Sequence, residues 1–216
     1  VDTGVEQGDE ITPHYDPMIA KLIVWDETRE RALARMLQAL AQYRVVGVAN
    51  NVGFLSRLVA CPAFSSADLD TGLIERERDY LFPGDGEPPR EAWLAAALAE
   101  LLRERASAQE SAGSGTDPHS PWHARDGWRV NSAARRQLTF RTGEHEQSVQ
   151  VAYAGTDYDL SLAGATLRAR GRLEAGGRLT ADFSGNRLNA TVVIAGEKRH
   201  VFLHGRAFIF SAVDPL

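Results

Sequence analysis

From Trp122 to the end of the chain, apolar residues stand at every second position, and this period of two limits what the region can form. Neighbouring side chains of a β-strand point to opposite faces, so the alternation predicts strands with one buried face. Turn-forming residues separate the strands at short, regular spacings. We therefore expect an antiparallel barrel or sandwich of about eight strands. The alternating segments are Leu138/Phe140, Val149/Val151/Tyr153, Tyr158/Leu160/Leu162, Leu179/Ala181/Phe183, Val201/Leu203 and Phe208/Phe210.

A long helix is expected just before these strands, from Arg90 to about Ala108. The segment is rich in Ala, and Pro89 suits its first turn. Its apolar stripe would make it the plug or partner of the barrel, because a small barrel has little interior volume. Glu100 and Glu104 share one helix face and are expected to be solvated. The stripe consists of Leu94, Leu98, Leu101 and Leu102, with Trp93 alongside.

Two breaker-rich segments divide the chain. Residues 83–89 read PGDGEPP and mark a boundary between a unit at 1–82 and a unit at 83–216. Residues 107–121 contain SAGSGTDPHSP, which predicts an exposed loop between the helix and the first strand.

The first unit is predicted to be a compact α+β piece. The apolar run Ile11–Trp25 favours two strands or one bent strand, and Tyr43–Val48 favours another. Between them, Asp26 or Thr28 can cap a helix that buries Leu33, Met36, Leu37 and Leu40. A second short helix covers residues 52–59 and is stopped by Pro62.

Composition excludes several classes of protein. The net charge is −5, with 11 Lys and Arg against 20 Asp and Glu in residues 1–121, and 13 against 9 in residues 122–216. The small positive surplus of the second part does not indicate nucleic-acid binding. No apolar run is long enough for a membrane helix, and no signal peptide is visible. Cys61 is the only cysteine, which rules out an intramolecular disulfide and a cysteine zinc cluster and favours a packing role.

Three segments of the first unit carry a family resemblance: GDEITPHYDPMIAKLIVWDETRERALARMLQAL, YRVVGVANNVGFLSRLVACPAF and DLDTGLIERE. They resemble the C-terminal domain of biotin carboxylase subunits in biotin-dependent acyl-CoA carboxylases. Val1–Phe82 is most similar to the alpha subunits of 3-methylcrotonyl-CoA carboxylases, through VDTGV, RVVGVANN, LDTGLIERERDYLFP and, further on, GWRVN. The helix and barrel fit the family's domain that links the alpha subunit to its partner.

The resemblance implies a ligase that forms carbon–carbon bonds in leucine degradation. ATP, Mg²⁺ and bicarbonate carboxylate biotin, and a carboxyltransferase beta subunit then passes the carboxyl group to 3-methylcrotonyl-CoA. The family's ATP-binding lobes would precede Val1 and its biotin site would follow Leu216. We therefore expect this chain to be inactive alone and to serve scaffolding and assembly in the bacterial cytoplasm. Its expected partners are the beta subunit and other alpha-subunit domains, without nucleic acid or membrane.

Few residues qualify as sites. By its place in the family, Leu73 lies near the adenine of ATP, although a core leucine is the simpler interpretation. Trp122 and Trp128, with Pro118 and His119, are expected to contact the partner subunit; both tryptophans could instead plug the barrel ends. His119 and His123 are four residues apart, but Ser120-Pro121 breaks a helix between them, so no metal site is expected. His14, Tyr15, Asp16 and Lys21 are assigned structural roles.

Two alternatives remain open. The chain could be a free-standing barrel that binds a small hydrophobic ligand, or the same carboxylase scaffold could serve another acyl-CoA. Carriers keep a cavity, whereas small barrels fill with side chains. The large alternating residues Phe140, Tyr153, Phe183 and Phe208 favour a filled interior.

Overall fold

The structure is a computed structural model that describes residues 1–216 except 13, 15–17, 85, 115–133 and 214–216. The chain divides into two compact units, which are described separately below. The first comprises Val1–Tyr43 and Asn50–Pro83, and the second comprises Arg44–Ala49 and Gly84–Leu216.

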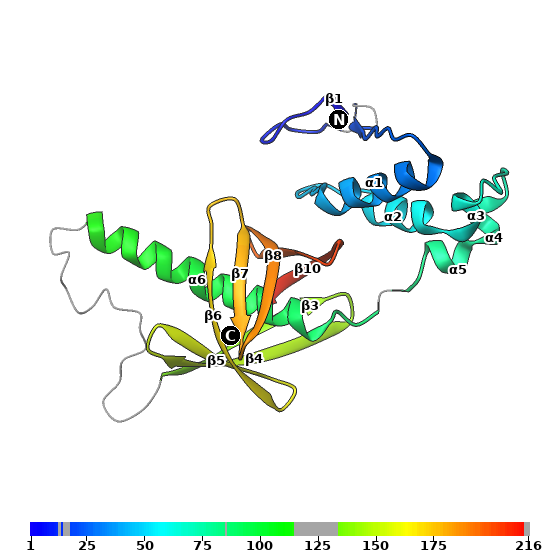
Figure 1. The fold of residues 1–216 in the computed structure, drawn as a ribbon. Helices are drawn as coiled ribbons and strands as arrows, with labels where there is room; N and C mark the ends of the chain where they lie inside the picture. Colours follow the sequence, from blue (N-terminus) through cyan, green and yellow to red (C-terminus); the bar gives the residue numbers. More distant parts are fainter. Residues whose placement is uncertain (13, 15–17, 85, 115–133, 214–216) are drawn as a thin grey trace. The chain divides into compact units, whose positions relative to one another are not determined.

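The first unit is mainly helical, and its only described sheet is one pair of very short antiparallel strands (Figure 1). Thr28 caps the first helix, since its hydroxyl accepts a hydrogen bond from the backbone N–H of Arg31. The predicted stripe ending at Leu40 faces inward. Pro62 does more than stop a helix, because it begins the next one after the buried Cys61. The elements are β1 (Asp2–Thr3), β2 (Ala20–Lys21), α1 (Arg29–Gln42), α2 (Val52–Ala60), α3 (Pro62–Ser65), α4 (Leu73–Arg76) and α5 (Arg78–Leu81).

Two strand predictions within residues 1–82 were wrong. Within Ile11–Trp25 only Ala20 and Lys21 form a strand among the described residues, and the side chains of Ile23 and Trp25 are 70% and 74% exposed. Tyr43–Val48 has no strand, and Gly47 there has a φ of 101°. Strand propensity is a weak preference, and a strand needs a neighbour for its backbone hydrogen bonds. In the described part of the unit only β1 supplies one.

The second unit contains a closed barrel of eight antiparallel strands, which confirms the α+β class and the expected strand count. Each strand pairs with the next along the chain, and the last pairs with the first to close the ring. The strands at residues 165–173 and 186–195 are not among the alternating segments predicted from the sequence. In the first of them an inward position is Gly171 and several outward positions are arginines. The strands are β3 (Arg135–Thr142), β4 (His145–Ala154), β5 (Asp157–Leu162), β6 (Ala165–Leu173), β7 (Arg178–Phe183), β8 (Asn186–Ala195), β9 (Lys198–Leu203) and β10 (Arg206–Val213).

Helix α6 (Arg90–Ser114) lies within the barrel and contacts strands around the ring (Figure 1). It is longer than predicted, since residues 107–114 of the expected loop are helical, while residues 115–121 lie outside the described part of the chain. From Ala92 to Leu102 every side chain is buried, on all faces of the helix. A one-sided stripe was therefore too narrow a prediction.

Close packing between helix and barrel explains why so many α6 residues are small. The ring of Trp93 lies 4.5 Å from that of Phe210 between centroids, and five of the eleven residues in the buried stretch are alanines. At Gly171 of β6, an added Cβ would lie 2.5 Å from the carbonyl oxygen of Thr180 and 3.3 Å from a methyl carbon of Leu98. Glycine is required there because the helix comes so near.

The turn between β5 and β6 offers a test of the local geometry. Ala163 and Gly164 have φ values of 49° and 79°, as in a type I′ turn, in which Asn tolerates the first position better than Ala. Ala163→Asn should raise the free energy of unfolding by about 1 kcal/mol in urea titrations. Ala165→Asn, which lies in strand β6, should give no gain; equal gains from both variants would contradict this explanation.

Candidate functional site

The barrel interior holds a buried ion pair between α6 and the wall. Glu100 of α6 and Arg199 of β9 are 5% and 7% exposed. Nε and Nη2 of Arg199 donate to Oε2 of Glu100 at 3.0 and 2.8 Å, and Nη1 donates to the carbonyl oxygen of Gly196 at 3.1 Å. Arg103, one turn further along α6, donates to the other carboxylate oxygen. The carboxylate is therefore bound on both oxygens.

The ionisation of Glu100 follows from these contacts. Burial by itself would raise the pKa of the carboxyl group, but the hydrogen bond from Arg103 and the charge and hydrogen bonds of Arg199 outweigh it. The pKa of Glu100 is therefore held below its ordinary value, and the group is charged inside the barrel. An unpaired charge would be very costly at such a site.

The expectation that Glu100 is solvated was wrong. The helix is enclosed by strands, so it has no free face at this level. Glu104 is also partly covered, and its Oε2 lies 2.8 Å from Nη2 of Arg136 on β3. The sequence did contain a signal for Arg199, which stands on the inward row of its strand with Val201 and Leu203. An arginine on a buried row requires an acid inside the barrel.

Two further arginines of α6 bind backbone carbonyls of the turns between strands. Nη2 of Arg90 donates to the carbonyl oxygen of Ala165 at 2.8 Å, next to the β5–β6 turn. Nη2 of Arg105 donates to that of Thr156 in the β4–β5 turn, also at 2.8 Å. The guanidinium of Arg105 lies 5.1 Å from the ring centroid of Tyr158. The helix is thus held by polar contacts at two levels besides Glu100.

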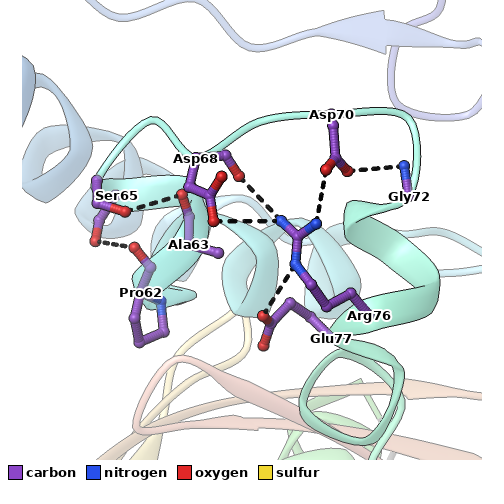
Figure 2. Close-up of polar contacts among 9 residues, drawn as sticks. Pro62, Ala63, Ser65, Asp68, Asp70, Gly72, Arg76 and Glu77 are labelled. Atoms are coloured by element: carbon purple, nitrogen blue, oxygen red, sulfur yellow. Dashed lines mark hydrogen bonds and ion pairs between the residues drawn. The ribbon is translucent and has the colours of Figure 1, made fainter.

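In the first unit, Arg76 organises the turn that carries Leu73 (Figure 2). Its Nη1 donates to Oδ2 of Asp70 at 2.7 Å, and its Nη2 donates to the carbonyl oxygen of Asp68 at 3.2 Å. Oδ1 of Asp70 accepts the backbone N–H of Gly72 at 2.8 Å, which shapes the turn into α4. The side-chain hydrogen bond with Arg76 keeps the pKa of Asp70 low and that of Arg76 high.

Leu73 is the first residue of α4 and is buried, 7% exposed. This burial accords with the core interpretation, and nearness to adenine stays a prediction. Pro118, His119, Trp122 and Trp128 lie outside the described residues, as does His123, so their partner contacts also stay predictions.

The resemblance implies biotin, ATP and Mg²⁺ as cofactors of the whole enzyme. Within the described ranges, no group of three or more His, Cys, Asp or Glu side chains could hold a metal ion such as Mg²⁺. Leu73 offers an apolar contact only, and no described residue is assigned to biotin. No chemical step of carboxylation is therefore assigned to this part of the chain. Among the helices described here, none has the length and apolar character needed to cross a membrane.

Comparison with known proteins places these two units in a family. Residues 1–76 match the model of the biotin carboxylase C-terminal domain, and residues 89–215 match that of the methylcrotonyl-CoA carboxylase alpha-subunit BT domain. A barrel filled by its own helix, preceded along the chain by a biotin carboxylase C-terminal domain, defines part of a biotin-dependent carboxylase alpha subunit. The chain belongs to the methylcrotonyl-CoA carboxylase alpha-subunit BT-domain family, as its sequence resemblance predicted.

Individual relatives agree with this assignment. The mitochondrial methylcrotonoyl-CoA carboxylase subunit alpha of Dictyostelium discoideum is 39% identical over 72% of this chain, and that of Mus musculus is 35% identical over 81%. The propionyl-CoA carboxylase alpha chain of Ruegeria pomeroyi is 39% identical over 76%. The matches cover 22%, 24% and 20% of these relatives, so the chain spans less than a quarter of their length.

Replacing Glu100 tests the buried pair. Glu100→Gln leaves Arg199 and Arg103 without a counter-charge and should lower the free energy of unfolding by about 3 kcal/mol at pH 7. Because the pKa of Glu100 is lowered in the fold, its contribution is present above the ordinary value of 4.5 and is lost as pH falls further. Urea titrations at a series of pH values should show this loss of stability in acid for the parent chain but not for the variant.

A control separates this effect from general changes in charge. Glu146→Gln removes the partner of Arg141 in an exposed pair on β3 and β4, and should change stability little. Burial, with the charge of Lys198, lowers the pKa of His200 below 6.5, so a loss of stability beginning under pH 6.5 should occur in every variant. An equal loss from Glu146→Gln and Glu100→Gln at pH 7 would refute the assignment.

Arg76 is tested by local hydrogen exchange. Arg76→Ala removes the contacts to Asp68 and Asp70, so backbone amides from Gly72 to Glu77 should exchange faster. Arg78→Ala, which breaks only an exposed pair with Glu75, is the matched control and should leave these rates unchanged. Similar exchange in both variants would mean that Arg76 does not hold the turn.

Proposed function

We propose that this chain is an assembly scaffold of a biotin-dependent acyl-CoA carboxylase, most like 3-methylcrotonyl-CoA carboxylase. In this proposal it links the biotin carboxylase part of the alpha subunit to a carboxyltransferase beta subunit and contacts other alpha-subunit domains. The carboxylation of biotin with ATP, Mg²⁺ and bicarbonate belongs to the whole enzyme, and this chain alone does not perform it. A bacterial relative supports placing it in the bacterial cytoplasm.

One observation carries the proposal: α6 fills the barrel from within. Eleven consecutive residues, Ala92–Leu102, are buried among the strands. A carrier of small hydrophobic molecules needs that volume for its ligand. The packed interior therefore disfavours the carrier alternative and supports a rigid domain that acts through its outer surface and its connections. The adjoining match to a biotin carboxylase domain supports a linking role.

The test is direct binding to the proposed partner. The chain, mixed with a purified methylcrotonyl-CoA carboxylase beta subunit from the same organism, should co-elute with it in size-exclusion chromatography at micromolar concentration. The chain alone should show no biotin-dependent ATP hydrolysis. Removal of residues 111–120, which include Pro118 and His119, should abolish co-elution without changing the unfolding temperature of the barrel. Undiminished binding after this deletion would contradict the role predicted for the segment.

A second acyl-CoA remains a candidate because of one relative. The propionyl-CoA carboxylase alpha chain of Ruegeria pomeroyi is as similar in identity as the Dictyostelium discoideum protein. The family model that matches residues 89–215 is nevertheless that of methylcrotonyl-CoA carboxylase. Binding to purified beta subunits of the two enzymes, compared in parallel, would decide between them.

A further inference from the structure

We propose that Glu100 and Arg199 are positioning residues that fix the register of α6 inside the barrel, and with it the exit point of the helix. The assembly consequence rests on the proposed function, since a linking domain must present its helix end at a defined place. The register itself does not depend on that function, and the two claims can be tested separately.

Apolar packing does little to fix the register in the second half of the buried stretch. The hydrophobic effect has no direction, and within Ala92–Leu102 Glu100 is the only charged side chain that can set the rotation of the helix. Trp93 against Phe210 and Leu98 against Gly171 position the first half by shape. Beyond Leu98 the buried residues are Ala99, Leu101 and Leu102, apart from Glu100.

The ion pair has the directionality that these apolar contacts lack. Two guanidinium nitrogens of Arg199 bind one oxygen of Glu100, and the third nitrogen is occupied by the carbonyl oxygen of Gly196. A shift of α6 by one residue moves its side chains by about 1.5 Å along the axis and about 100° around it. Such a shift would separate Glu100 from Arg199, leaving Arg199 buried without its counter-charge and Glu100 with Arg103 of its own helix as its remaining charged partner.

The pair is better explained by specificity than by stability. Replacing a buried ion pair by apolar residues of similar volume is often neutral or stabilising, because desolvation offsets the attraction between the charges. Selection of one register among several packed alternatives is the best-attested role for such groups. Stability and register should therefore respond differently to the same substitutions.

The decisive variant is Glu100→Leu combined with Arg199→Leu in the full chain. Its unfolding temperature should equal or exceed that of the parent, while amides of Ala92–Leu102 should exchange at least tenfold faster. The indole N–H of Trp93, which donates to the carbonyl oxygen of Pro88, should give more than one NMR peak. Trp93→Phe identifies that peak among those of the four tryptophans. The control Arg141→Gln with Glu146→Gln, on the outer surface, should match the parent.

Unchanged exchange and a single Trp93 peak in the double-leucine variant would overturn the register claim. Should that variant fail to fold, Glu100→Gln, which keeps the shape of the side chain, decides the question by the number of Trp93 peaks alone, because its expected loss of stability also speeds exchange. The consequence for assembly is tested by binding: the affinity of the double-leucine variant for a purified beta subunit should be at least tenfold lower than that of the parent. Altered register with unchanged affinity would overturn the positioning role, whereas no binding by the parent would overturn the proposed function alone.

Discussion

The passage of α6 through the closed barrel is the contact on which the second unit depends. In a barrel of eight strands, the side chains of the strands can fill the interior by themselves. In this barrel a helix occupies the interior. The helix fits because five of its eleven buried residues are alanines and because Gly171 has no side chain where the backbone of β6 comes close to Leu98. In turn, the strands bury the apolar helix, which would be only marginally stable by itself in water.

For a helix enclosed in this way, polar contacts serve to fix its position in the barrel and not only to add stability. Arg90 binds a carbonyl at the start of β6 and Arg105 binds one in the β4–β5 turn, and Glu100 binds Arg199 between these two levels. Each contact joins a specific α6 residue to a specific strand or turn. Such contacts suit a domain whose proposed task is to hold other parts of an enzyme in place, and at the level of Ala92–Leu102 the buried helix occupies the barrel interior.

The first unit is organised by more exposed polar contacts. Arg76 joins Asp68 and Asp70 to α4, and Thr28 and Asp26 define the start of α1, with Asp26 bound to Arg31 and Arg35. Its exposed apolar residues Ile23 and Trp25 differ from the packed interior of the barrel. Local capping and turn chemistry therefore explain this unit better than a large core does.

Sequence by itself determined the family, the helices α1 and α2 of the first unit and an antiparallel fold of about eight strands, because capping residues and period-two alternation are local signals. Only the tertiary structure decided that α6 is buried on every face, that Glu100 is an internal charge and that Tyr43–Val48 is not a strand. These outcomes depend on which segments become neighbours, and neighbours supply the hydrogen bonds, counter-charges and covering surface that no single segment contains. Glu100 and Arg199 are 99 residues apart, and only the closure of the barrel around the helix joins them.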